Sequence, residues 1–234
     1  CDYKNFIRKA HLKEIPLVGG EKAILEPLRV TLIWLYLIYK DRFLNLGIDF
    51  TRDINKKKWQ VFKKIYLAGF NAPLASSMGR LFDAVASLVL VRYRAGFEGE
   101  LAIELEKIAQ AAGAQTAYYN FGIIKDKEDY IIDPGPLFKE IIQDLKAGKP
   151  KARIAYCFHL SVARMILKMS LILRKNTGIN KVALSGGVFQ NSLLLKLTLG
   201  LLYKRGFEVF THKNLSCNDS GISLGQAVIA SFGG

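Results

Sequence analysis

The feature that most constrains the fold is a strand, a glycine turn, a helix and a second strand that follow one another near the C-terminal end. Lys181 to Leu184 reads as a buried strand, Ser185-Gly186-Gly187 as a tight turn, Phe189 to Lys204 as a helix and Glu208 to Thr211 as a second strand. This order is typical of an α/β unit with parallel neighbouring strands. A helix from Gly221 to Phe232 is expected to follow.

The rest of the chain is predicted to be mainly helical, because apolar residues recur in steps of three and four. Short irregular patterns interrupt it: a strand from Phe6 to Ile15, and two short strands within Ala114 to Asp133. The first predicted helix, Glu21 to Phe43, would be about 35 Å long. The other predicted helices are Asp53 to Ala68, Arg80 to Val91 with Ser76 or Ser77 as its N-cap, Glu98 to Ala112, Pro134 to Lys146 and Lys151 to Asn176.

Composition indicates a folded protein, since 234 residues of which 50% are hydrophobic can bury one core, or two lobes around a cleft. The strongest candidate for a membrane span, Val30 to Tyr39, is about half of the roughly 20 residues that a bilayer requires. There is no export signal. Cys1, Cys157 and Cys217 form no C-x-x-C pair. A reducing, cytoplasmic location is therefore expected.

The net charge is +14, from 34 Lys plus Arg against 20 Asp plus Glu. Such a charge attracts phosphates, nucleic acid or an acidic partner. The alternative, which we favour, is a solvated surface coated with lysine. The densest cluster, Lys56 to Lys58 with Lys63 and Lys64, alternates with apolar residues and reads as the outer face of a packed helix.

Gly186 and Gly187 are the sharpest chemical signal, because they stand between a strand and a helix. Glycine lets the backbone approach a ligand, and free N–H groups at a helix start favour a phosphate. Asn191, one turn into the predicted helix, would donate a hydrogen bond to a ribose or base. The alternative is a turn that serves geometry alone.

Two further segments carry polar groups at helix starts. Asp219, in Asn218-Asp219-Ser220-Gly221, either caps the last helix or offers an oxygen ligand to a metal, although one carboxylate cannot make a metal site alone. Arg80, in Ser76-Ser77-Met78-Gly79-Arg80, would clamp a phosphate or acyl-phosphate, or else form an ion pair with Asp83.

Other titratable residues give weaker signals. Glu98, Glu100 and Glu104 crowd the start of a predicted helix and can simply complement its dipole. His11, His159 and His212 are too widely spaced for a histidine-based metal site, and His159 either lines a cleft or is structural.

Taken in order, these segments resemble the C-terminal domain of the HypF carbamoyltransferase family. Pro16 to Glu21 and Glu26 to Arg29 are also similar to the family's P-x-x-G-G-E and E-P-W-R segments. The resemblance implies an α/β fold of the actin, sugar-kinase and heat-shock (ASKHA) type with a largely helical insertion. It divides the chain into residues 1–15, a strand continuing from an N-terminal lobe that precedes the chain; 16–178, helical insert and cleft-lining helices; and 179–234, a C-terminal α/β lobe.

The resemblance further implies a reaction and its participants. A carbamoyl-adenylate made from carbamoyl phosphate and ATP passes its carbamoyl group to the C-terminal cysteine of HypE, on the way to the cyanide ligands of nickel-iron hydrogenase. ATP or carbamoyl-adenylate and a divalent metal (Mg, Fe or Zn) are the implied cofactors, and HypE and the preceding domains are the implied partners. By position, Gly186, Gly187 and Asn191 would hold the nucleotide, Ser76, Ser77, Gly79 and the catalytic Arg80 would face its phosphate or carbamoyl end, and Asp219 would bind the metal.

Some residues depart from the family pattern. Leu28, Phe97 and Ser220 stand where Trp, Tyr and Gly are usual, and Ser220 places a side chain beside Asp219. The family's other metal ligands, a histidine pair, belong to a segment before the first residue of this chain, so the chain alone is expected to be weakly active or inactive. Two alternatives remain open: a non-catalytic nucleotide- or RNA-binding module related to tRNA threonylcarbamoyl-adenosine enzymes, and a pure docking surface for HypE.

Overall fold

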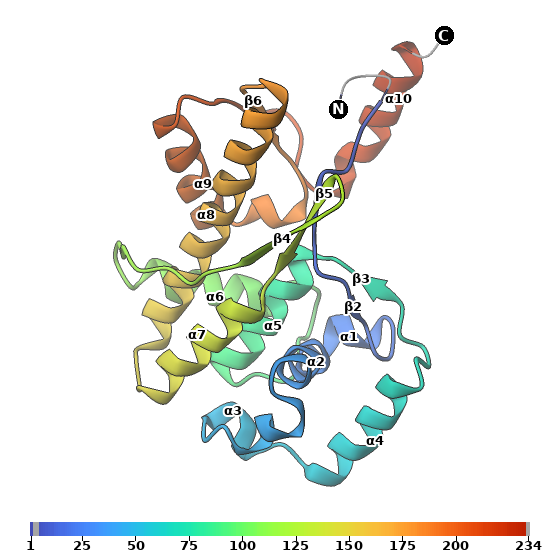
Figure 1. Cartoon of the computed structure of the whole chain (residues 1–234), viewed down its shortest axis with the longest axis vertical. Helices are drawn as coiled ribbons and strands as arrows, with labels where there is room; N and C mark the ends of the chain where they lie inside the picture. Colours follow the sequence, from blue (N-terminus) through green and yellow to red (C-terminus); the bar gives the residue numbers. More distant parts are fainter. Residues whose placement is uncertain (2–4, 233–234) are drawn as a thin grey trace. The chain divides into compact units, whose positions relative to one another are not determined.

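A computed structural model describes residue 1 and residues 5–232, which form two compact units (Figure 1). The helical unit comprises residues 12–124 and 131–158, and the C-terminal unit comprises residues 1–11, 125–130 and 159–234. The units are interleaved along the sequence and each is described by itself. Four elements contain residues of both units: β1 (Ala10–Leu12), β4 (Gly122–Asp126), β5 (Asp129–Asp133) and α8 (Lys151–Thr177).

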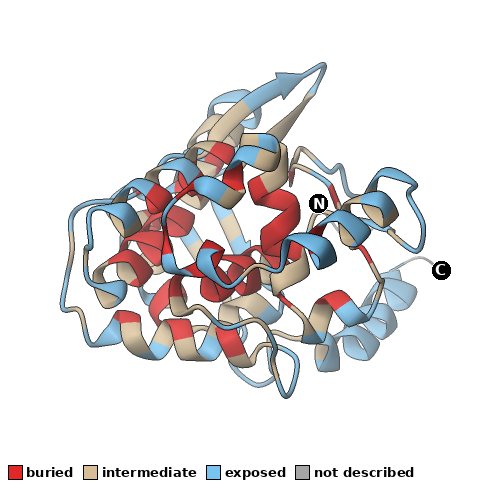
Figure 2. Ribbon diagram, turned by 90° about the horizontal axis from the view of Figure 1, so that it is seen from below, coloured by how far each residue is buried: buried red, intermediate tan, exposed pale blue. Residues whose placement is uncertain are grey.

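The helical unit is organised around α2, which packs on α5, on α7 and on the short helix α1. Buried aromatic side chains such as Phe82 and Phe138 fill the space between these helices. Figure 2 shows the buried residues gathered in the central helices. Its elements are β2 (Ile15–Pro16), α1 (Lys22–Leu25), α2 (Leu28–Tyr39), η1 (Lys40–Asn45), α3 (Asp49–Arg52), α4 (Lys56–Leu67), β3 (Leu74–Ala75), α5 (Met78–Leu90), α6 (Glu100–Gln110) and α7 (Gly135–Lys146).

One predicted helix is broken in two and another starts later than the sequence predicts. The helix predicted from Glu21 to Phe43 stops at Leu25 and restarts at Leu28, because Pro27 has no N–H to continue the first helix and fits the start of the second. The second of these helices, α2, ends at Tyr39, and its C-cap residue Lys40 has a positive φ of 52°. The helix predicted from Asp53 to Ala68 begins only at Lys56, because Asn55 is extended and caps it.

The remaining helices of this unit agree with the sequence within a few residues. Ser77 is the N-cap of α5, as predicted, and its side chain accepts a hydrogen bond from the amide of Arg80. The two strands predicted before Asp133 are β4 and β5, which form a sheet in the order β1-β5-β4. The sequence did not indicate β3, which pairs antiparallel with β2 and brings Ala75 opposite Ile15.

The C-terminal unit contains the predicted parallel strand pair. β6 (Lys181–Leu184) and β7 (Glu208–Thr211) are parallel, with Lys181 opposite Glu208 and Leu184 opposite Thr211. Their inner side packs with Leu202 and Phe207 and with residues of α8 and α9 (Ser192–Lys204). The last helix, α10 (Ile222–Phe232), contains no buried residue and is exposed throughout in Figure 2; it follows η3 (Asp219–Gly221).

The helix α8 is long and apolar enough to cross a membrane by length and composition, with a mean hydropathy of 1.4 over its most apolar stretch. The sequence had instead singled out Val30 to Tyr39. Half of the apolar stretch in α8 is buried inside the protein. A helix in the core of a soluble protein can have the same length and apolar composition. This feature is therefore weak evidence for a membrane span.

Two buried threonines offer a test of the packing. The hydroxyl of Thr31 donates to the carbonyl of Ala84 (3.0 Å) or of Pro27 (3.1 Å) and so joins α2 to α5, whereas that of Thr198 has no hydrogen-bond partner among the described residues. We expect Thr31→Val to lower the free energy of unfolding by about 1 kcal/mol. The matched change Thr198→Val should cost nothing or stabilise the protein. Urea unfolding followed by circular dichroism measures both, and equal losses would contradict this account.

Candidate functional site

The glycine turn after β6 has the backbone conformation that its sequence predicts. Gly186 has a φ of 101°, a region that residues with a Cβ rarely adopt. A Cβ on Gly186 would meet nothing within 4 Å, so glycine is required for the conformation of the backbone and not for lack of space. The turn is therefore open on the side where a side chain would point.

The hydrogen bonds of the turn determine which amides remain available. The amide of Gly186 donates to the carbonyl of Cys217 (2.8 Å), and the amide of Phe189 donates to the carbonyl of Gly186. Across residues 5–232, the amides of Gly187 and Val188 donate to no acceptor. Two neighbouring N–H groups at an open turn form an arrangement suited to an anion.

The helix after the turn starts later than the sequence predicts. Residues Gly187–Gln190 form a 3₁₀ turn, η2, and α9 begins at Ser192 instead of Phe189. Asn191 is extended and is the N-cap of α9, so the prediction that it lies one turn inside the helix is wrong. Its short polar side chain competes for backbone groups and favours the cap.

The side chain of Asn191 has two partners within the protein. Its Oδ1 accepts from the amide of Leu194 (2.8 Å), and its Nδ2 lies 2.9 Å from Nε2 of His159, which is fully buried in α8. Since the amide of Leu194 can only donate, Nδ2 must face the histidine, and Nε2 of His159 must accept. The ring is then neutral with its proton on Nδ1. His159 therefore positions Asn191.

Two pairs of polar side chains link the turn region to the loop after β7. Nε2 of His212 lies 2.9 Å from Oγ of Ser185, and Gln190 donates to Ser216 at 3.4 Å. The sequence had treated His212 as structural and gave no signal for Gln190 or Ser216. Only the parallel pairing of β6 and β7 brings the loops after these strands to the same edge of the sheet.

The loop that carries Asp219 lies beside the turn, because Cys217 accepts from Gly186 and the Cβ of Asn218 is within 3.9 Å of where a Cβ on Gly187 would be. Asn218, not Asp219, caps η3, since its Oδ1 accepts from the amide and hydroxyl of Ser220. Asp219 is exposed. No group of three His, Cys, Asp or Glu suited to a metal occurs among the residues described.

Arg80 belongs to the helical unit and is almost fully buried, with 8% of its surface exposed. Its Nη1 lies 3.1 Å from Oδ2 of Asp83, and its Nη2 donates to Oε1 of Glu98 at 2.8 Å. The ion pair with Asp83 that the sequence offered as an alternative to ligand binding is thus present. Glu98 is a second partner; the sequence had assigned it only to the dipole of the following helix.

The two carboxylates around Arg80 differ in their exposure. Asp83 has 3% of its side chain exposed, whereas Glu98 has 67%. Burial raises the pKa of Asp83 to about 6, although the positive charge of Arg80 opposes this shift. The contact with Asp83 also lacks hydrogen-bond geometry, so Nη1 and Oδ2 have no hydrogen-bond partner within the described chain. Glu98 is therefore the partner that an incoming anion displaces more easily.

The predicted site residues divide between the two units. Ser76, Ser77, Gly79 and Arg80 come together at the start of α5 in the helical unit. Gly186, Gly187, Asn191 and Asp219 come together around the glycine turn in the C-terminal unit. The first cluster lies within one continuous segment, whereas the second combines the loops that follow β6 and β7.

A parallel strand pair with an open glycine turn, joined to a helical unit, defines an α/β protein with a candidate anion site, and comparison with known proteins identifies its family. Residues 1–226 match the family model described as "Carbamoyltransferase, Kae1-like Domain, second subdomain". The chain belongs to this family, and the relatives that it matches include several HypF carbamoyltransferases.

Carbamoyltransferase HypF of Rhodobacter capsulatus is 37% identical, and the match covers 98% of this chain and 29% of that protein. Carbamoyltransferase HypF of Synechocystis is 35% identical, and the match covers 94% of this chain and 29% of that protein. The crystal structure of full-length HypF in the phosphate- and nucleotide-bound form superposes with a TM-score of 0.92 at 40% identity, over 99% of this chain and 30% of that one. HypF of T. kodakarensis gives a TM-score of 0.83 at 29% identity. The chain thus spans about 30% of the length of these relatives. The predicted α/β class and family are confirmed.

The contact between Asn191 and His159 leads to a prediction about stability. We expect Asn191→Ala to lower the free energy of unfolding by about 2 kcal/mol, because it removes both a helix cap and a buried hydrogen bond. Asn55→Ala is the matched control, since Asn55 caps α4 through the amide of Lys58 and is exposed. The control should cost about 1 kcal/mol. Urea unfolding compares them, and an equal cost would mean that His159 contributes nothing through Asn191.

Asp83 leads to a prediction about pH. Its folded pKa of about 6 lies above the ordinary value of 3.8, so its contribution to stability is present below that ordinary value and is lost as pH rises through 6. Relative to Asp83→Asn, the wild-type protein should lose about 2 kcal/mol of unfolding free energy between about pH 4.5 and about pH 7.5.

Asp41→Asn is the control for this experiment. Hydrogen bonds from Lys63 and Trp59 lower the pKa of Asp41, so its contribution to stability is present above the ordinary value of 3.8 and is lost only as pH falls below it. Urea unfolding across this pH range measures both variants. A constant difference between wild type and Asp83→Asn would show that Asp83 titrates normally.

Proposed function

We propose that this chain is the part of a HypF-type carbamoyltransferase that holds the nucleotide during carbamoyl transfer in hydrogenase maturation. The family match and the relatives named carbamoyltransferase HypF support this proposal, as does the similarity to a HypF solved in a phosphate- and nucleotide-bound form. The nucleotide is ATP or the carbamoyl-adenylate derived from it. The proposal extends to an ASKHA-type fold in the complete protein.

The observation that carries the proposal is the open turn at Gly186 and Gly187. Its two free amides, at Gly187 and Val188, point to an anionic group, and a phosphate is the anion that such turns commonly bind. The polar side chains of Ser185, His212 and Gln190 would supply donors and acceptors for the remainder of a nucleotide. Asn191, held by His159, would contribute its remaining hydrogen-bonding capacity there.

The proposed reaction moves a carbamoyl group from phosphate oxygen to sulfur. The thiolate of the acceptor, the C-terminal cysteine of HypE, attacks the carbamoyl carbon, the bond from that carbon to the phosphate oxygen breaks, and AMP leaves with the electron pair. Negative charge develops on the carbamoyl and phosphate oxygens. Fixed N–H groups stabilise such charge without reorganising, which is how the turn would accelerate the step.

Arg80 would stabilise the same charge only after it exchanges a partner. In the structure its charge is balanced by Asp83 and Glu98. Because Glu98 is largely exposed, a phosphate or carbamoyl oxygen can replace it on Nη2, while Asp83 holds the guanidinium in place. Ser76, Ser77 and Gly79, at the start of the same helix, would face the ligand beside it.

A divalent metal is implied by the family resemblance, but the residues described do not fit a complete site. Asp219 is a suitable oxygen ligand, yet no second or third ligand gathers around it in the described chain. Whether the metal is Mg, Fe or Zn has no bearing on the steps proposed above. None of them passes through a metal.

Further domains and a cytoplasmic location belong to the proposal. Parallel strands are usually covered on both faces, but in β6 and β7 only the face with Val182 and Leu184 is covered, while Ala183 and Phe210 are exposed. The exposed apolar side chains of α10 include Ile222 and Ile229. We propose that the other domains of a longer HypF protein cover these surfaces.

The test is a chimera in which this chain replaces the corresponding region of Rhodobacter capsulatus HypF. We expect it to carbamoylate the acceptor cysteine of HypE, detected by mass spectrometry, and to release AMP. Gly186→Ala should lower this activity at least tenfold, because its Cβ strains the turn. Gly206→Ala is the matched control: Gly206 has a φ of 73° but lies away from the turn.

Two outcomes would contradict the proposal. If Gly186→Ala and Gly206→Ala lose the same activity per folded molecule, the turn serves geometry only. If the chimera binds HypE normally but transfers no carbamoyl group, the chain is a docking surface. Salt-sensitive RNA binding without transfer would instead support the nucleic-acid alternative, to which the similarity with the Thermosipho melanesiensis tRNA threonylcarbamoyltransferase (27% over 164 residues) lends some support.

A further inference from the structure

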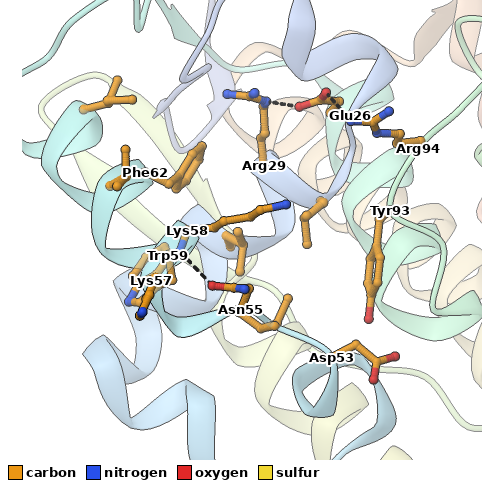
Figure 3. Close-up of a pocket in the computed structure, with 15 residues that line it drawn as sticks. Glu26, Arg29, Asp53, Asn55, Lys57, Lys58, Trp59, Phe62, Tyr93 and Arg94 are labelled. Atoms are coloured by element: carbon orange, nitrogen blue, oxygen red, sulfur yellow. Dashed lines mark hydrogen bonds and ion pairs between the residues drawn. The ribbon is translucent and has the colours of Figure 1, made fainter.

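The helical unit contains a pocket of about 700 Å³ that includes none of the predicted site residues (Figure 3). It lies between α2, α4, the link from α3 to α4 and the segment that follows α5. This volume is in the range of small-molecule sites. The proposed carbamoyl transfer makes no use of this pocket.

The inner part of the pocket is apolar. Leu28 and Leu32 of α2 face Phe62 and Ile65 of α4, with the buried ring of Trp59 beside them. Trp59 is fixed in place, because its Nε1 donates to Asp41 at 2.9 Å and its ring meets Phe43 edge to face. A rigid apolar surface of this kind favours a ligand with a flat or aliphatic body.

The rim of the pocket is basic, and one of its two acids is already paired with arginines. Glu26 pairs with both Arg29 (2.6 Å) and Arg94 (3.5 Å). Lys58 has no carboxylate within salt-bridge distance in the described part of the chain. In Figure 3, Lys58 extends across the middle of the pocket between Arg29 and Asn55, and Tyr93 stands on the opposite side. With Lys57, four cations face two carboxylates, Glu26 and Asp53.

The start of α4 adds to the positive potential of this rim. Asn55 caps the helix by accepting from the amide of Lys58, so the positive end of the helix dipole lies at the pocket. Arg94 is mobile enough to reorient, since 82% of its side chain is exposed and its contact with Glu26 is long. Lys58 and Arg94 are therefore the cations best placed to receive an acid group.

We infer that this pocket binds a small organic anion: a carboxylate or phosphate monoester whose acid group meets Lys58 and Arg94 and whose apolar body lies on Leu28, Leu32 and Phe62. A neutral compound of the same shape lacks the partner for Lys58. Inorganic phosphate alone lacks the apolar body. The inference is independent of the function proposed for the glycine turn.

The chain provides its own reporter for a test. It contains two tryptophans, and Trp34→Phe leaves Trp59, which lines the pocket, as the only one. In this background we would titrate 8-anilinonaphthalene-1-sulfonate, an aromatic anion, and follow energy transfer from Trp59. We expect saturable binding of one molecule, displaced by benzoate or phenyl phosphate but not by benzyl alcohol or inorganic phosphate. The stronger of the two competitors identifies the preferred acid group.

A charge reversal decides whether the signal comes from this pocket. Lys58→Glu with Arg94→Glu should weaken binding at least tenfold. Lys64→Glu with Lys107→Glu, the same change in net charge at exposed residues outside the pocket, should change it less than twofold. Circular dichroism confirms that both variants are folded.

Three results would overturn the inference. Equal weakening in the two charge-reversed proteins would show attraction by net charge alone. Equal displacement by benzyl alcohol would show that the acid group is not recognised. Displacement by AMP alone, abolished by Gly186→Ala, would place the probe at the glycine turn and would support the proposed function while contradicting this site.

Discussion

The hydrogen bond from the amide of Gly186 to the carbonyl of Cys217 is the constraint on which the candidate nucleotide site depends. It ties the turn after β6 to the loop after β7, and thereby brings Asn218 and Asp219 beside the glycines. It also uses the amide of Gly186, while the next two amides, at Gly187 and Val188, have no acceptor among the described residues. Gly186 makes this bond with a φ of 101°, a conformation that residues with a Cβ rarely adopt.

Arg80 illustrates the opposite arrangement, in which a cation is buried and balanced. A guanidinium with 8% exposure needs counter-charges, and Asp83 and Glu98 supply them. The raised pKa of Asp83 shows that burial outweighs the attraction of Arg80 for this carboxylate. Holding one carboxylate inside and one at the surface keeps the arginine fixed while leaving one side of it exchangeable. The free amides of the glycine turn require no such exchange.

The sequence predicted most helices and the parallel pair β6 and β7, because these depend on local apolar periodicity and on glycine turns. It failed where a single residue interrupts a continuous pattern, as at Pro27 and Asn55, since both sides of each break carry the same apolar spacing. It identified the glycine turn and Asn191 but not their partners: His159 meets Asn191, and His212 meets Ser185, only after the chain folds back. The pairing of Arg80 with Glu98 was hidden for the same reason.

The two proposed anion-binding surfaces would attract negative charge by different means. The glycine turn uses backbone dipoles held in a fixed geometry, and Lys58 and Arg94 use exposed side-chain charges. Interactions between exposed charges are screened within about 8 Å at physiological ionic strength, whereas direct hydrogen bonds from fixed amides are screened much less. Ionic strength therefore separates the two surfaces. The dispersed net charge of +14 brings anions towards both, but local geometry determines which of them an anion stays on.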